Sequence, residues 1–262
     1  MKIVILLLLS LSLYSQSCPS SSYIPKNALK YMPTVYKEAI AIVPHEVDST
    51  YFSSLIELES CVRLCGDNYY ARRCWNPASE LKTKREQGVG FGQITRAWKS
   101  DGRLRFDTLE NLRKKYPKEL HKLTWGNIKE QPELQITAIM LLWKDNYRLL
   151  TNDITTENKI AFSDSMYNGG YKYLNRERKK CKLLKNCDST VWFNNVALIK
   201  SGRAKRKLYG NRTAWDINRH HVNSILKIRW RKYKLAFKEE MKNNNFIYQK
   251  YDDGSIMRFY GE

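Results

Sequence analysis

The stretch that decides the fold covers residues 132–150 and reads PELQITAIMLLWKDNYRLL. Proline at its first position suits the first turn of a helix, where the missing N–H has no partner in any case. The apolar residues that follow are spread around nearly the whole circumference of a helix, which is typical of a helix buried on all sides. We therefore expect a central helix against which the other segments pack.

Further helices are predicted on both sides of this stretch. Asp48-Ser49-Thr50 offers N-cap residues for a helix from Tyr51 to about Leu64. A helix over residues 158–167 should stop at Gly169-Gly170, because glycine commonly ends helices. A long amphipathic helix is expected over residues 213–242.

Other segments are predicted to be less helical. Residues 18–44 are rich in proline, which predicts a loop-rich N-terminal segment with short helical pieces. A Gly-rich turn predicts a short β element near residues 88–95. Residues 243–262 alternate apolar and polar positions around Asp253-Gly254, which predicts a C-terminal β-hairpin. The expected fold class is mainly α, with residues 45–242 as the main domain.

The N-terminus predicts export. Residues 1–17 combine Lys2, an apolar run of about a dozen residues and small polar residues before Cys18, which is the pattern of a signal peptide. The run is shorter than the roughly 20 residues of a transmembrane helix, and retention as a membrane anchor is the alternative. Lipidation of Cys18 is less favoured, because Ser15 stands where a lipobox carries an aliphatic residue. We expect a periplasmic or extracellular protein at the cell envelope.

Six cysteines agree with export, because an even number in an exported chain indicates disulfides. Cys65–Cys74 and Cys181–Cys187 are the shortest local pairs, although sequence alone leaves the connectivity open. Cys61–Cys65 is disfavoured, because side chains four apart on a helix rarely reach disulfide geometry. Zinc binding by the clustered cysteines competes with this view. No CxxC motif is present, so we expect neither a metal nor a cofactor.

The chain is strongly basic, with a formal net charge of +20. Residues 171–240 alone hold 20 Lys and Arg against 5 Asp and Glu. Such a charge favours polyanionic partners, and we expect this segment to bind anionic polymers of the cell envelope. We do not expect nucleic acid as a partner, because an exported protein rarely meets it. We also expect the protein to be a monomer. The competing hypothesis is a secreted polyanion-binding protein without catalysis, whose stacking aromatics would be Tyr171, Trp192, Trp215 and Trp230.

One carboxylate is a candidate general acid. On the predicted helix, Glu59 lies one turn after Leu55 and Ile56 and shares their apolar stripe. Glu57 follows serines and should face water. Apolar surroundings favour the protonated form of a carboxyl group, which a general acid needs. The alternative is a frayed helix end, where Glu59 would simply turn to solvent.

The chain resembles the catalytic domain of soluble lytic transglycosylases, which belong to the lysozyme-like superfamily and are related to goose-type lysozymes. The resemblance covers about residues 45–235. Phe91-Gly92 and Met166 depart from the Leu-Met and Ala that the family carries there. The motifs that carry the resemblance stand in the family's order: Glu59-Ser60, then Gly90-Phe91-Gly92-Gln93-Ile94, the apolar 132–150 helix, and Met166-Tyr167-Asn168-Gly169-Gly170.

The resemblance implies a lysozyme-like fold and a role for each matching residue. Glu59 would be the single catalytic acid and base, and Ser60 would hold its carboxylate. Gln93 and Asn168 would bind sugar, and Tyr167 would lie close to Glu59. Ser60, Gln93, Tyr167 and Asn168 are thus the expected substrate-binding set.

The implied reaction is cleavage of peptidoglycan glycan strands at the β-1,4 bond between N-acetylmuramic acid and N-acetylglucosamine. Most glycosidases use two carboxylates, whereas a transglycosylase uses one, because the C6 hydroxyl of the substrate closes a 1,6-anhydro ring. The alternative is a hydrolytic lysozyme, a muramidase in which Glu86 activates water. A surface ion pair with the neighbouring Lys82, Lys84 and Arg85 competes for Glu86. A bacterial and a phage origin are both open.

Overall fold

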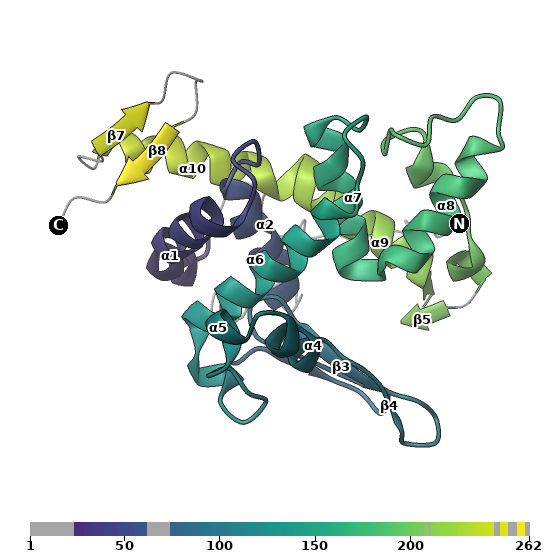
Figure 1. The fold of residues 1–262 in the computed structure, drawn as a ribbon, viewed down its shortest axis with the longest axis horizontal. Helices are drawn as coiled ribbons and strands as arrows, with labels where there is room; N and C mark the ends of the chain where they lie inside the picture. Colours follow the sequence, from purple (N-terminus) through teal and green to yellow (C-terminus); the bar gives the residue numbers. More distant parts are fainter. Residues whose placement is uncertain are drawn as a thin grey trace, which may run out of the picture.

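The structure, a computed structural model, describes residues 24–61, 74–205, 207–209, 211–243, 247–250 and 256–259. Helices form most of it, and a small antiparallel sheet extends from them (Figure 1). The α-helices are α1 (Lys26–Ile42), α2 (Thr50–Ser60), α4 (Thr108–Lys115), α5 (Pro117–Leu120), α6 (Pro132–Arg148), α7 (Thr156–Gly169), α8 (Tyr171–Lys182), α9 (Ala214–Asn223) and α10 (Trp230–Asn243). Short 3₁₀ turns are η1 (Ile128–Glu130), η2 (Val196–Leu198) and η3 (Gly202–Lys205), and η4 (Ser224–Arg229) is a π-helix.

The central helix is confirmed as α6, which begins at Pro132 as expected. Its Ile136, Ile139 and Trp143 pack into a core shared with α1 and α2. Ala138 and Leu141, on the other side of α6, pack into a second core beneath the sheet and α4. Because apolar groups lie on both sides of α6, the helix joins two of the three hydrophobic clusters that the described residues form.

The caps of α2 and α7 follow from their sequences. Asp48 Oδ1 accepts hydrogen bonds from the Thr50 amide (2.9 Å) and hydroxyl (2.7 Å). At the other end α2 stops at Ser60, four residues before the expected Leu64. Helix α7 ends where Gly170 takes a φ of 82°, so the predicted glycine stop is confirmed.

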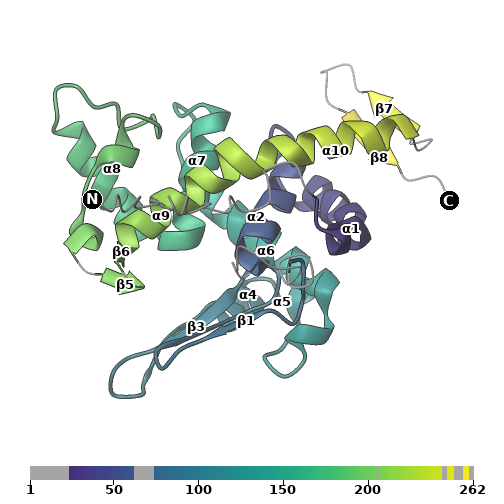
Figure 2. The ribbon, with the colours of Figure 1, turned by 180° about the vertical axis from the view of Figure 1, so that it is seen from behind.

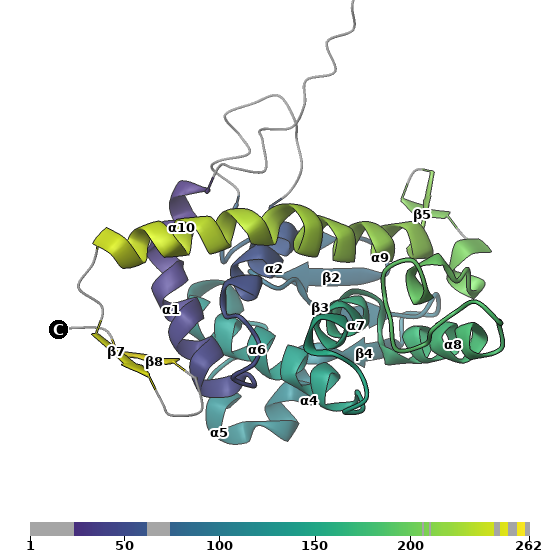
Figure 3. The same ribbon diagram turned by 90° about the horizontal axis from the view of Figure 1, so that it is seen from above.

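The C-terminal helical segment runs as α9, η4 and α10 along the whole helical body (Figure 3). A capping box of Thr213 and Asp216 starts it. The predicted apolar stripe is buried at Val222, Ile225 and Tyr233. This segment contacts both α2 and α7, which matters for the site.

The sheet is larger than the predicted β element. Strands follow in the order β1 (Glu80–Lys82), β2 (Glu86–Val89), β3 (Ile94–Trp98) and β4 (Leu104–Asp107), each antiparallel to the next. The strands project away from the helices (Figure 2). Only β2 and β3 overlap the expected region. β1 and β4 are short, charged and largely exposed, so they lack the alternation that predicts a strand.

The prediction of a loop-rich segment over residues 18–44 is wrong for most of its length. Residues 26–42 form the single 17-residue helix α1, with Pro33 inside it. Ala28, Met32, Val35 and Ala39 recur at helical spacing and are all buried. This apolar stripe outweighs the proline, because it packs against α6 and α2.

The tail forms the predicted β-hairpin of β7 (Ile247–Lys250) and β8 (Ile256–Phe259), with Ile247 opposite Phe259. Its turn lies outside the described residues, as does the predicted signal peptide of residues 1–17. A two-strand pairing of β5 (Lys207–Tyr209) with β6 (Arg212–Thr213) precedes α9. No helix in the described part of the chain combines the length and apolar character that a membrane span requires.

Two disulfides join cysteines of the described residues, and the Cys181–Cys187 prediction is confirmed. The other is Cys61–Cys74 rather than the expected Cys65–Cys74. Cys61 is the residue that leaves α2 in an extended conformation, which brings its Cα within 4.2 Å of that of Cys74. Cys18 and Cys65 lie outside the described residues. The two bridges are consistent with an oxidising compartment.

Candidate active site

Glu59 lies in the last turn of α2 with 16% of its side chain exposed. The apolar stripe that it shares with Leu55 and Ile56 is buried as predicted, but its surroundings also contain a charged group. Its Oε1 lies 2.7 Å from Nε2 of His221, which comes from α9. The direct neighbour of the candidate acid is therefore an ionisable ring, which can exchange a proton with it or support its negative charge.

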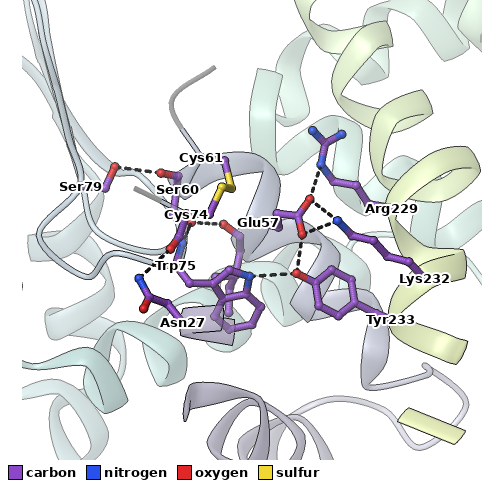
Figure 4. Close-up of a disulfide and its surroundings, with 11 residues drawn as sticks. Asn27, Glu57, Ser60, Cys61, Cys74, Trp75, Ser79, Arg229, Lys232 and Tyr233 are labelled. Carbon is purple, nitrogen blue, oxygen red and sulfur yellow. Dashed lines mark hydrogen bonds and ion pairs between the residues drawn. A yellow bond between two sulfur atoms is a disulfide. The ribbon is translucent and has the colours of Figure 1, made fainter. Parts of the chain in front are cut away.

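Glu57 does not face water as predicted. Only 1% of it is exposed, and its carboxylate is enclosed by Arg229, Lys232 and Tyr233 from the C-terminal helical segment (Figure 4). Lys232 Nζ lies 2.7 Å from the carboxylate, the Tyr233 hydroxyl 2.5 Å and Arg229 Nε 3.2 Å. Ser53 and Ser54 share this face of α2. These serines were the reason to expect a solvent-facing side of α2. Their side chains are small, so the C-terminal helical segment packs closely against this side instead.

His221 connects two carboxylates. Its Nδ1 lies 2.8 Å from Oδ2 of Asp164, a residue of α7 with no exposed surface. Burial by itself would lower the pKa of His221, but the charge and hydrogen bond of Asp164, followed by those of Glu59, raise it to about 10. The ring is therefore an imidazolium at neutral pH. It donates one N–H to each carboxylate, because both ring nitrogens are donors in the charged form.

Asp164 is held in turn by a buried tyrosine. The Tyr51 hydroxyl donates to Asp164 Oδ1 at 2.5 Å and accepts from the Trp143 indole at 3.1 Å. Burial and the neighbouring Asp164 carboxylate raise the pKa of Tyr51 well above its usual value, so it stays a neutral donor. A continuous chain of hydrogen bonds thus runs from Trp143 in the core to the partly exposed Glu59.

The Gly90–Gln93 turn lies against α6 and α7. The Tyr167 hydroxyl donates to the Gly92 carbonyl at 2.8 Å, and a Cβ on Gly92 would come within 2.4 Å of Tyr167 Oη and Ile139 Cγ1. Gly90 has a φ of +82°, and a Cβ there would lie 2.1 Å from the Gln135 amide oxygen. Glycine is needed at both positions, because any side chain would push the turn away from the helices.

Tyr167 lies within electrostatic range of Glu59, as the resemblance implies. Burial raises the pKa of its hydroxyl well above the usual value, and the charges of Glu59 and Asp164 raise it further. Tyr167 is therefore a neutral donor that ties the turn to α7. The side chains of Glu59, His221, Asp164 and Tyr167 form one cluster at the meeting of α2, α7 and α9.

Ser60 and Gln93 make their hydrogen bonds elsewhere. Ser60 Oγ donates to the Ile56 carbonyl at 2.6 Å and accepts from the Trp75 amide at 3.0 Å. Its proton is therefore used inside α2, and His221 rather than Ser60 holds the Glu59 carboxylate. Gln93 Nε2 donates to the Gly90 carbonyl at 3.0 Å, which braces the turn. A sugar-binding role for Gln93 remains a prediction.

Asn168 is exposed near the end of α7. Its Oδ1 accepts from Asn218 Nδ2 at 3.1 Å, and Asn218 comes from α9. A sugar-binding role for Asn168 remains a prediction. Glu86 lies at the start of β2, opposite Ala97 of β3, and is partly exposed. Val89, beside the turn, lies three steps along the strand from Glu86, roughly 10 Å away.

Sequence reasoning missed His221 and Asp164 as site residues. Adjacent rings on a helix point about 100° apart, so the pair His220-His221 does not predict a shared ligand site. A usable signal stood in α7, where Asp164 lies one turn from Ile160, Ala161 and Tyr167. An aspartate on an apolar helix face needs a buried partner.

The described residues hold no group of three or more His, Cys, Asp or Glu side chains arranged to bind a metal ion. The groups of the cluster can donate or accept protons. They are the carboxyl groups of Glu59 and Asp164, the imidazolium of His221 and the neutral hydroxyls of Tyr51 and Tyr167. Comparison of the chain with models of protein families and with curated proteins gives no match, so its function has to be argued from this cluster.

Proposed function

We propose that the protein is a peptidoglycan lytic transglycosylase with Glu59 as its acid and base. The observation that carries this proposal is the contrast between the two carboxylates of the cluster. Glu59 is partly exposed, whereas Asp164 has no exposed surface and lies behind His221. A substrate can reach only one of them. This arrangement suits the one-carboxylate mechanism that the resemblance implies.

The proposed reaction consists of two proton transfers at Glu59. The Glu59 carboxyl gives its proton to the glycosidic oxygen, and the bond between that oxygen and C1 of N-acetylmuramic acid breaks. The C6 hydroxyl of the same sugar then forms the new bond to C1, and its proton passes to the Glu59 carboxylate. Glu59 regains its starting form, no water is consumed, and the product carries a 1,6-anhydro ring.

A Glu59→Gln variant tests the assignment of the acid. Glutamine keeps the shape of the side chain and cannot donate the proton, so turnover of purified peptidoglycan should fall by a factor on the order of 10²–10⁴. Wild-type activity in this variant would remove Glu59 from the site. Thermal unfolding of the variant, compared with wild type, shows whether the fold is retained.

Product analysis separates the transglycosylase from the hydrolase. Anhydro-muropeptides are lighter by one water than hydrolysed ones, so mass spectrometry of the digest distinguishes the two reactions. Products with reducing ends would favour a muramidase with Glu86 as the second carboxylate, and Glu86→Gln should then abolish activity. Anhydro products together with an active Glu86→Gln variant would support the single-carboxylate reaction.

We further propose that the protein acts at the cell envelope, where its basic surface binds anionic polymers. Three cations, Arg178, Lys179 and Lys182, line a surface pocket that also holds one carboxylate, Asp153, with Asn175 and two threonines. The burial of Trp192 argues against a polyanion-binding protein without catalysis, because a fully buried indole cannot stack on a ligand. Trp215 and Trp230 are only partly exposed, and their indoles donate to Ile199 and Thr50.

A further inference from the structure

His221 is placed to act on Glu59 without touching a substrate. Its side chain is 6% exposed, and its two nitrogens lie 2.7 Å from Glu59 and 2.8 Å from Asp164. Both contacts join separate elements, since Glu59 belongs to α2, His221 to α9 and Asp164 to α7. The ring orientation is therefore fixed by tertiary structure rather than by the helix that carries it.

The charges around the ring come from two packed helices. Glu59 and Tyr51 belong to α2, and Asp164 and Tyr167 belong to α7. Both tyrosines are neutral donors, so Asp164 and Glu59 are the groups that balance the imidazolium. Asp164 is the fixed partner of the ring, because it is buried and its other oxygen receives a hydrogen bond from Tyr51. The charge of Glu59 can therefore change while the ring stays in place.

We propose that His221, fixed by Asp164, is the positioning residue that holds the Glu59 carboxyl and stabilises its ionised form between the two proton transfers. This inference rests on the proposed function. When Glu59 gives its proton to the glycosidic oxygen, the new carboxylate is met by an imidazolium already aimed at Oε1. No solvent has to reorganise, because the donor is in place before the reaction. The His221 proton itself stays on Nε2.

The same contact fixes which oxygen reacts. Because Nε2 of His221 binds Oε1, the second oxygen of Glu59 carries the transferable proton. Helix α2 alone would leave the side chain free to rotate at its partly exposed end. A misplacement of about 1 Å can lower a rate on the order of 10²-fold, so holding this carboxyl has a measurable effect.

The first test compares His221→Gln and Asp164→Asn with wild type on soluble, uncross-linked peptidoglycan strands. His221→Gln removes the charge, and Asp164→Asn keeps the shape while removing the anchor of the ring. In both variants kcat should fall on the order of 10²-fold, with KM changed much less. The exposed His45→Gln serves as the matched control and should behave as wild type.

A pH profile separates this role from a purely structural one. Because the His221 ring is charged below its pKa of about 10, the kcat advantage of wild type over His221→Gln should be complete at neutral pH and shrink as the pH approaches 10. A wild-type kcat in His221→Gln would overturn the inference. So would a lowered kcat whose ratio to wild type stays constant with pH, because that result describes a structural role only.

Nitrogen NMR of the substrate-free protein keeps this inference distinct from the proposed function. Both ring nitrogens of His221 should stay protonated from about pH 5 to pH 9 in wild type. A ring that titrates near its ordinary pKa of about 6.5 would overturn the inference even in an active enzyme. A protonated ring in a protein that cleaves no glycan would instead overturn the proposed function and, with it, the role assigned to His221.

Discussion

Glu57 supplies the negative charge that compensates Arg229 and Lys232 in the core. Burial lowers the pKa of Lys232, and the Glu57 charge opposes that effect. In Glu57→Gln both cations stay buried but lose the carboxylate that they contact. The free energy of unfolding should therefore fall by about 3–5 kcal/mol, measured by urea denaturation. A solvent-facing Glu57 would instead give almost no loss of stability on substitution.

A surface ion pair provides the control for Glu57→Gln. Glu110 pairs with Arg113 at 2.9 Å, and its side chain is 42% exposed. Glu110→Gln makes the same chemical change and should cost at most about 1 kcal/mol, because water screens exposed charges. Equal small losses in the two variants would show that Glu57 is not held in a dry ion-pair cluster.

Protonation of His221 links stability to pH. Its folded-state pKa of about 10 lies above the ordinary value of 6.5, because the attraction of Asp164 and Glu59 outweighs burial. The stabilisation is complete below the unfolded pKa and is lost as the pH rises toward 10. Urea unfolding of wild type and His221→Gln at about pH 6, 8 and 10 should show the difference between them shrinking with pH. A difference that stays constant would contradict the charged ring.

The residues of the site were predictable to the extent that they belong to local motifs. Glu59 and Tyr167 follow from short sequence patterns, and the structure places them in one cluster. His221 is 162 positions from Glu59, so no local pattern joins them. The prediction that Glu57 faces water is wrong for a related reason. Helical spacing shows which residues share a face, but it does not show whether another helix covers that face.

At the scale of elements, the packing of the Gly90–Gln93 turn against α6 and α7 makes Gly92 sensitive to substitution. In Gly92→Ala the added Cβ would lie 2.4 Å from both Ile139 Cγ1 and Tyr167 Oη. Relief of this overlap should break the hydrogen bond from Tyr167 to Gly92. We expect the free energy of unfolding to fall by about 1–3 kcal/mol, and glycan turnover to fall with it. Gly202→Ala is the control, because nothing lies within 4 Å of its added Cβ. If Gly92→Ala and Gly202→Ala had the same free energy of unfolding and the same turnover, the close packing of the turn would be contradicted.

The elements that could be predicted are those whose pattern is self-contained. α6 follows from its proline start and continuous apolar surface, and the tail hairpin follows from alternation around a turn. α1 and the outer strands depend on tertiary contacts. Pro33 masks the apolar stripe of α1, and β1 and β4 are stabilised by pairing with β2 and β3 rather than by apolar alternation.

At the scale of the whole molecule, the basic charge divides into buried and exposed parts. Arg203 and Arg219 are buried against Glu177, each at 2.9 Å, within the basic segment 171–240. Burial lowers the pKa of Arg219 to about 10, although Glu177 opposes the effect. These cations stabilise the fold and are not accessible to a partner. The accessible charge lies along α8 and the residues after it, where Lys179 and Lys182 are exposed.

The exposed part of this charge is the part that we expect to bind the cell envelope. Arg178 donates to the Ser189 carbonyl and lies over the Phe162 ring, so it is left intact. Lys179→Gln with Lys182→Gln, both at the surface pocket, should weaken binding to intact cell walls and flatten its salt dependence, because fewer charges are screened. Turnover of soluble glycan should stay at the wild-type level.

The matched control removes the same charge at another place: Lys114→Gln with Lys122→Gln, on α4 and after α5. If net charge alone drew the protein to the wall, both double variants would bind equally weakly. If α8 forms a local site, only the Lys179 and Lys182 variant loses binding, because screening in salt confines each charge to roughly 10 Å. Collapse of soluble-glycan turnover in that variant would contradict the separation of binding from chemistry, since it would place α8 within reach of Glu59.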